Sequence, residues 1–131
     1  MRTLGIDFGS KRVGIALSDE SGNFALPYGV IENNTNLVQE IKELCQINNV
    51  SEIVIGESKD FNGNDNIIMK DIRLFVDKIK EQTNIPINFH PEFMTSAQAE
   101  QIQGKNDMLD ASAASLILGS YLEFKKNHDN N

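Results

Sequence analysis

The sequence predicts an α/β fold in which helices cover a mixed five-stranded sheet. Three strand patterns separated by turn signals occupy the first 31 residues, which predicts an antiparallel meander. Helical patterns then alternate with two more apolar strand patterns, which is typical of βαβ units with parallel strands. The length of 131 residues fits one domain. We therefore expect a single domain over residues 1–126 and a polar tail over 127–131.

The meander is predicted from three runs of strand-forming residues, 2–7, 12–18 and 24–31. The first turn contains Gly9, which is free to adopt a positive φ. Pro27 lies inside the third run, where it favours an edge strand or a bulge because proline cannot donate to a ladder. The three strands should therefore form one side of the sheet.

The middle of the chain predicts two helices around a buried strand. A helix is expected over residues 36–48, with Thr35 as its N-cap. The apolar run within 51–56 suits a central strand that is buried on both faces. The polar segment 58–66 is typical of an exposed loop, and a second helix is expected over 65–82, because its apolar residues recur at helical spacing.

The last third of the chain predicts one strand and two helices. A short strand is expected over 86–89. Thr95 and Gln98 match a capping box, which opens a helix that should end at Gly104. Asp110 is expected to cap the last helix, from residue 111 to about 124.

Composition excludes several classes of protein. No stretch approaches the roughly 18–20 apolar residues of a membrane helix, and residues 1–7 do not resemble a signal peptide. The single cysteine, Cys45, is expected to be a small buried hydrophobe in a reducing, cytoplasmic compartment. The net charge of −7 argues against nucleic-acid binding by bulk electrostatics. It does not exclude a local basic patch with bound divalent metal.

Four carboxylates occupy the ends of predicted elements, and each has an ordinary structural explanation. Asp7 could bond the turn backbone, Glu57 could be a solvated loop residue, Glu92 could favour a helix start, and Asp110 could be only an N-cap. Together they are more informative, because acids at strand ends converge on one rim of an α/β sheet. Converging carboxylates are typical ligands of Mg²⁺ or Mn²⁺, and two such ions can hydrolyse a phosphodiester.

Three other residues are weaker candidates. His90 could act as an acid or base near Glu92, although a lone histidine is more often structural. Lys11 and Arg12 flank the first turn, where they could contact phosphate groups or form an ordinary exposed hairpin tip.

The segment from Leu4 to Asp19, LGIDFGSKRVGIALSD, closely resembles the opening signature of the YqgF family of Holliday junction resolvase-like and pre-16S rRNA-processing proteins. The remaining chain is similar to that family in length and element order. The resemblance implies an RNase H-like fold. It also implies a metal-dependent nuclease that trims the 5′ end of the small-subunit ribosomal RNA precursor.

The resemblance also implies which residues are catalytic. Asp7 corresponds to the first-strand acid, Glu92 to the acid within PEFMTS, and Asp110 to the acid that opens the last helix in DASAA. These three carboxylates are then the expected ligands of two Mg²⁺ or Mn²⁺ ions.

Two departures from the family pattern concern the second acid. Pro91 and Phe93 stand where the family usually has Asp and Arg, and an arginine would be a bidentate partner for phosphate or carboxylate. Glu57 stands where the family usually has the Leu of Gly-Leu-Pro. Because the implied fold puts the fourth strand beside the first, we hypothesise that Glu57 joins or replaces Glu92 as a metal ligand near Asp7.

Other functions fit some of the same residues. A non-catalytic module that binds RNA or a ribosome-assembly partner agrees with the negative charge. A Holliday junction resolvase acting on branched DNA would normally be a homodimer, whereas an RNA nuclease could be a monomer. An ATPase of the actin and sugar-kinase type is suggested by Asp7-Phe8-Gly9, but those proteins pair two such domains. A structural partner with no nucleic-acid role is the plainest alternative.

Overall fold

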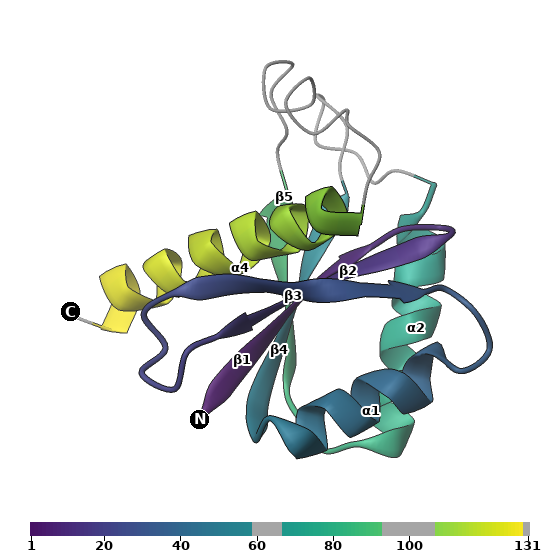
Figure 1. The fold of residues 1–131 in the computed structure, drawn as a ribbon, viewed down its shortest axis with the longest axis horizontal. Coiled ribbons are helices and arrows are strands. Elements are labelled where there is room, and N and C mark those ends of the chain that lie inside the picture. Colours follow the sequence, from purple (N-terminus) through teal and green to yellow (C-terminus); the bar gives the residue numbers. More distant parts are fainter. Residues whose placement is uncertain (59–66, 93–106, 130–131) are drawn as a thin grey trace.

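In the computed structural model, which describes residues 1–58, 67–92 and 107–129, five strands form one sheet in the order β3-β2-β1-β4-β5 (Figure 1). The strands are β1 (Arg2–Phe8), β2 (Arg12–Ser18), β3 (Ala25–Glu32), β4 (Val50–Ser58) and β5 (Ile87–Glu92); the helices are α1 (Leu37–Ile47), α2 (Met69–Gln82) and α4 (Asp107–Asp129). The predicted α/β class and mixed five-stranded sheet are confirmed.

The first three strands form the expected antiparallel meander. β1 pairs with β2, and β2 pairs with β3, which is an edge strand. The β2–β3 register shifts between Ile15 and Ala16, opposite Gly29 and Pro27. Pro27 therefore lies where its sequence position predicted, on an edge strand at a bulge, because a missing N–H is tolerated there.

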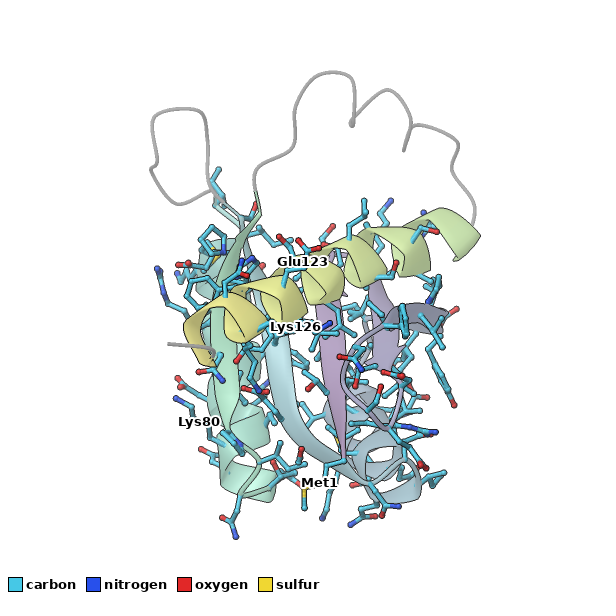
Figure 2. The ribbon with its side chains drawn as sticks, turned by 90° about the vertical axis from the view of Figure 1, so that its left-hand side faces the viewer. Met1, Lys80, Glu123 and Lys126 are labelled. Carbon is cyan, nitrogen blue, oxygen red and sulfur yellow. The ribbon has the colours of Figure 1, made fainter. Side chains whose placement is uncertain are left out.

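The other half of the sheet is parallel. β4 lies beside β1, and β5 lies beside β4, both in parallel register. The crossover helices α1 and α2 lie on one face of the sheet, and α4 lies across the other (Figures 1 and 2). The carboxyl ends of β1, β4 and β5 therefore meet at one edge, as parallel strands require.

Two hydrophobic cores fill the two faces. The core under α1 and α2 contains Ile53 and Ile55, whereas Val54 belongs to the core under α4. This alternation confirms that β4 is buried on both faces. Cys45 is 3% exposed in the first core, and burial raises the pKa of its thiol to about 11. Cys45 therefore behaves as the expected small hydrophobe.

Several predicted boundaries were wrong. Asn36 rather than Thr35 is the N-cap of α1, and it makes no side-chain capping bond. α2 begins at Met69, four residues later than expected. The last helix runs from Asp107 to Asp129, so Asp110 lies in its first turn instead of capping it, and the helix continues into the predicted tail. Contacts with the sheet extend and trim helices in ways that local sequence does not encode.

Two further expectations need correction or lie outside the described residues. Gly9 does not adopt a positive φ; instead, a Cβ at Gly9 would lie 2.4 Å from the Arg12 carbonyl oxygen, so the turn requires glycine for space. The predicted helix from Thr95 to Gly104 and nearly all of the predicted loop 58–66 lie outside the described residues. Among the described helices, none is long and apolar enough to cross a membrane.

Candidate active site

Asp7 lies near the carboxyl end of β1, and it is half-buried. It pairs with Gly14 on β2. On the other side, Ile6 pairs with Ile55, so continuing the register by one residue brings Gly56 beside Asp7. Neither neighbour has a side chain, so these two strands place no side chain directly beside the carboxylate. Sequence analysis did not single out these glycines, because their role depends on strand register.

The ends of β4 and β5 bring two more of the predicted acids to the same edge. Glu57 pairs with Pro91, and Ser58 pairs with Glu92. Glu92 is thus the last residue of β5, rather than a residue after a strand ending at Phe89. The backbones of Asp7, Glu57 and Glu92 therefore lie at the ends of three adjacent strands. β4 separates the other two, so Glu57 is on the strand next to that of Asp7.

The direction of α4 brings the fourth acid toward this edge. The Ala114 carbonyl and the Leu118 side chain pack over Gly5 of β1. Farther along the helix, Tyr121 contacts Glu52, near the amino end of β4. α4 therefore runs from the carboxyl ends of the parallel strands toward their amino ends. Asp110, one turn before Ala114, has its backbone at the carboxyl end.

His90 is engaged with aromatic side chains of α4. Its ring centroid lies 5.8 Å from that of Tyr121 and 5.9 Å from that of Phe124, both in edge-on geometry. Desolvation lowers the pKa of His90, and the charge of Glu57 partly opposes that effect. These contacts give His90 a packing role between β5 and α4. The charge of Glu57 therefore acts on His90, which lies near the end of β5.

The predicted basic pair lies on the adjoining turn. Lys11 and Arg12 are both exposed, and Arg12 pairs in register with Glu32 of β3. A hollow of about 640 Å³ is lined by both cations together with Ser10, Val30, Glu32, Asn33 and Asn34. A cationic hollow beside the Asp7 strand could accept a phosphate group of a nucleic-acid strand.

The donor set at this edge fits a hard divalent cation. Carboxylate oxygens from several strand ends are the ligands that Mg²⁺ and Mn²⁺ prefer. Among the side chains that the structure describes, which do not include those of Glu92 and Asp110, no three His, Cys, Asp or Glu residues gather as a metal centre. Gly14, which pairs with Asp7, has no Cβ that would lie beside the carboxylate.

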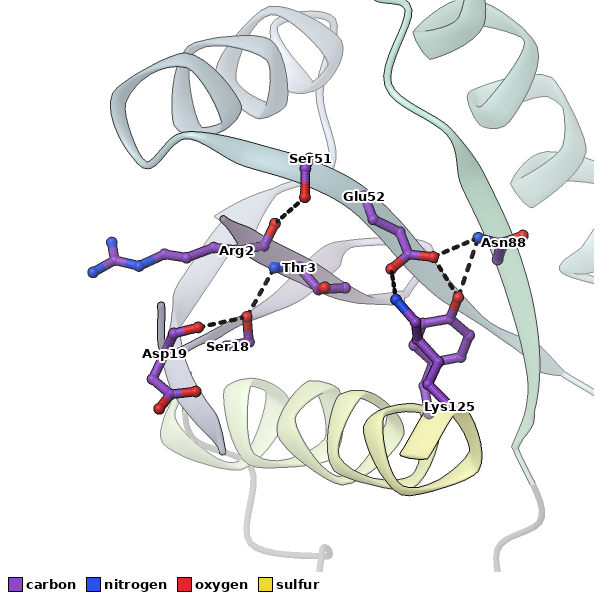
Figure 3. A network of polar contacts seen from close by, with 9 residues as sticks. Arg2, Thr3, Ser18, Asp19, Ser51, Glu52, Asn88 and Lys125 are labelled. Atoms are coloured by element: carbon purple, nitrogen blue, oxygen red, sulfur yellow. Dashed lines mark hydrogen bonds and ion pairs between the residues drawn. The ribbon is translucent and has the colours of Figure 1, made fainter. Parts of the chain in front are cut away.

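A polar cluster that sequence analysis missed anchors the far end of α4 (Figure 3). The Tyr121 hydroxyl donates to the Glu52 carboxylate, Lys125 Nζ lies 2.9 Å from Glu52 Oε1, and Asn88 Nδ2 donates to Glu52 Oε2 at 2.8 Å. The carboxylate is largely buried and is met by three donors, so its desolvation is compensated. This cluster joins β4, β5 and α4 at the edge opposite the acids.

Solved structures that share this fold include two Holliday junction resolvases. RuvC of Thermus thermophilus in complex with a Holliday junction substrate has a TM-score of 0.64 at 14% identity, over 96% of each chain. The Fowlpox virus resolvase in complex with Holliday junction DNA has a TM-score of 0.56 at 14% identity, over 95% of this chain and 98% of the other. At such identities the likeness shows the fold alone, and it confirms the RNase H-like expectation.

Sequence relatives are similar over nearly the whole chain. One from Maridesulfovibrio salexigens is 33% identical over 93% of this chain and 98% of its own length. One from Clostridium acetobutylicum is 35% identical over the same shares. Both are named as proposed pre-16S rRNA nucleases. The family described as "RuvX: Holliday junction resolvase" matches residues 1–124. The chain belongs to the RuvX family.

Membership in the RuvX family confirms the resemblance of the opening segment, since RuvX is the YqgF-type family. It also confirms the predicted class of enzyme, a nuclease acting on nucleic acids. Within a RuvX protein, the strand that carries Asp7 is the one that bears the family signature. The edge at which β1, β4 and β5 end is therefore the candidate active site.

Proposed function

We propose that this RuvX-family protein is a divalent-metal-dependent endonuclease that cleaves phosphodiester bonds during 5′-end processing of pre-16S rRNA. The observation that carries the proposal is the edge where β1, β4 and β5 end. Asp7, Glu57 and Glu92 each lie within the last two residues of their strand, and Asp7 pairs with Gly14. A carboxylate near the end of a strand, beside other strand-end acids, is suited to hold a cation against a substrate phosphate.

The proposed ligands are Asp7, Glu92 and Asp110, with Glu57 joining or replacing Glu92. The chemistry that two Mg²⁺ or Mn²⁺ ions supply when bound is Lewis-acid stabilisation of the phosphodiester oxygens and a lowered pKa for water. The chain's own contribution is to fix the carboxylates on rigid strand ends and a helix start. His90 is assigned to packing, because it contacts the rings of α4.

Lys11 and Arg12 are the proposed contacts to substrate phosphates. Both are exposed beside the end of β1, in a protein whose net charge is −7. Because the overall charge repels nucleic acid, binding should depend on these local cations together with bound metal. Such contacts position the strand without reading its sequence.

The proposed substrate is an RNA precursor, since the relatives from two bacteria are named for that activity. Branched DNA is the second candidate, because RuvC and the Fowlpox enzyme, which share the fold, were solved with Holliday junctions. A junction substrate would require a homodimer that cuts two strands symmetrically, whereas a monomer suffices for RNA. The proposed location is the cytoplasm, where a lone buried thiol such as Cys45 stays reduced.

The decisive test is Mn²⁺-dependent cleavage of single-stranded RNA and of branched DNA by the purified protein. Asp7→Asn should lose at least about 100-fold in cleavage rate, because it removes a charged metal ligand. Asp77→Asn is the matched control, since Asp77 is an exposed acid on α2, and its cleavage should be unchanged.

The comparison of substrates separates the candidate functions. Preference for RNA over junction DNA supports processing of the rRNA precursor, and the reverse preference supports resolution of branched DNA. If folded parent protein cleaves neither substrate, the nuclease proposal fails. Binding to RNA without cleavage would then favour the non-catalytic module.

A further inference from the structure

Asn33 ties the segment after β3 to the turn between β1 and β2. Its side-chain Nδ2 donates to the Gly9 carbonyl oxygen at 2.8 Å. Its backbone N–H donates to the Lys11 carbonyl oxygen at 2.9 Å. One residue thus holds two carbonyls of the same turn, although it lies 24 positions from Gly9 in the chain.

The turn has little support of its own. The β1–β2 ladder ends with the pairing of Phe8 and Val13, so residues 9–11 lie beyond it. The Gly9 position is tight, because a Cβ there would lie 2.4 Å from the Arg12 carbonyl oxygen. Asp7, in contrast, is held within the ladder by its pairing with Gly14. Truncating the Asn33 side chain removes the bond to Gly9 and keeps the backbone bond to Lys11. It should therefore displace the Gly9 part of the turn more than it displaces Asp7.

Lys11 lies in the turn, and Arg12 follows it directly as the first residue of β2; both cations are exposed. Lys11 and Arg12 line the hollow of about 640 Å³, and Asn33 forms part of its wall. Asn33 also lines a second hollow of about 510 Å³, which continues from Ser10 along α2 as far as Gln82. Asn33 therefore lies between the hollow at Lys11 and Arg12 and the hollow beside α2.

We infer that Asn33 is a positioning residue that fixes the turn bearing Lys11 and Arg12 where these cations meet the phosphates of the substrate strand. The inference rests on the proposed function, because it takes the substrate to be a nucleic acid. It adds a residue that acts through Lys11 and Arg12 rather than through the carboxylates. It follows that Asn33 should affect substrate binding more than the chemical step.

A double-mutant cycle tests this coupling. The dissociation constant of a fluorescent single-stranded RNA is measured in Mg²⁺, with Asp7→Asn in every protein to prevent cleavage. Asn33→Ala should weaken binding by about 5–10-fold. In the Lys11→Ala/Arg12→Ala background, the same substitution should weaken binding by less than about 2-fold, because the cations it positions are gone.

Asn34→Ala is the matched control. Asn34 lines the same two hollows, but its side-chain oxygen accepts a bond from the Asn36 backbone N–H at 2.9 Å, which lies outside the turn. Its effect should be small in both backgrounds. Asn33→Ser provides a second variant, since a shorter hydroxyl cannot reproduce the bond to Gly9, and thermal melting checks that every variant is folded. It should behave as Asn33→Ala does.

Kinetics on the active protein provide the readout that a merely structural role would not move. Asn33→Ala should raise KM and leave kcat within about 2-fold. Equal weakening by Asn33→Ala with and without the two cations would overturn the inference, as would a fall in kcat at unchanged KM. If the RNA binds with the expected coupling but parent protein never cleaves, the proposed function fails while this inference stands.

Discussion

At the scale of single residues, the glycines on the neighbouring strands distinguish Asp7 from an ordinary turn aspartate. Gly14 and Gly56 flank it on the neighbouring strands. A turn aspartate would need only a nearby backbone N–H, whereas a cation and a phosphate need room beside the carboxylate. Gly14 and Gly56 have no side chains to occupy that position, and strand register brings them beside Asp7.

The second metal ligand can be identified by comparing Glu57 with Glu92. β4 lies next to β1, but its alternation puts Glu57 on the face of Ile53 and Ile55, so Glu57 must reach Asp7 around the strand end. If it is a ligand, Glu57→Gln should lower Mn²⁺-dependent cleavage by at least about 10-fold, because a ligand charge is lost without a change in shape. Glu92→Gln, measured in parallel, shows whether the two acids act together. Full loss in Glu92→Gln with none in Glu57→Gln would refute a role for Glu57.

At the scale of elements, the contact between β1 and α4 aligns the strand of Asp7 with the helix of Asp110. Gly5 allows the close approach, since a Cβ there would lie 2.8 Å from Leu118 Cβ and 3.2 Å from the Ala114 carbonyl oxygen. The distance between β1 and α4 therefore requires glycine at position 5. Any atom added at this contact must move the helix or the strand.

We predict that Gly5→Ala destabilises the protein by about 1–3 kcal/mol, because the extra methyl group overpacks the contact. Cleavage should also fall, since α4 carries Asp110. Gly29→Ala is the control: a Cβ at Gly29 meets nothing within 4 Å. Chemical denaturation measures both variants, and equal stability for the two would contradict the role assigned to Gly5.

The C-terminal part of α4 is held against the sheet by the bonds of Tyr121 and Lys125 to Glu52. We predict that Tyr121→Phe lowers the free energy of unfolding by about 1–2 kcal/mol, because Glu52 loses a hydroxyl donor while remaining largely buried. Tyr28→Phe changes an exposed ring on β3 and should cost less than about 0.5 kcal/mol. A Tyr121→Phe protein as stable as the Tyr28→Phe protein would show that the cluster contributes little.

At the scale of the whole molecule, the acidic edge and the net charge of −7 make cation binding a question of stability as well as catalysis. Acids held close together repel one another, and a bound divalent ion would relieve that repulsion. Metal binding should therefore be visible without any substrate.

We predict that Mn²⁺ raises the melting temperature of the parent protein by several degrees, because a ligand at 100 times its Kd stabilises the folded state by about 2.7 kcal/mol. EDTA should reverse the rise. Asp7→Asn should show a much smaller shift, and Asp77→Asn should match the parent. An equal shift in the parent and Asp7→Asn would place any bound metal elsewhere.

The sequence by itself determined the strands of the meander, the apolar stripes of α1 and α2, the edge position of Pro27 and the family signature around Asp7. These features are local, because periodicity and turn chemistry are encoded within a few neighbouring residues. The same local reasoning misplaced Thr35 and the start of α4, whose limits depend on packing against the sheet.

Only the tertiary structure decided which residues became neighbours across the sheet. It paired Asp7 with Gly14, brought β4 beside β1, joined Asn33 to the turn at Gly9, and gathered Glu52, Asn88 and Tyr121 into one cluster. The physical reason is that strand register and helix packing are fixed by the summed burial of two cores. The total burial of the two cores depends on residues from the whole chain, so no short stretch of sequence determines it.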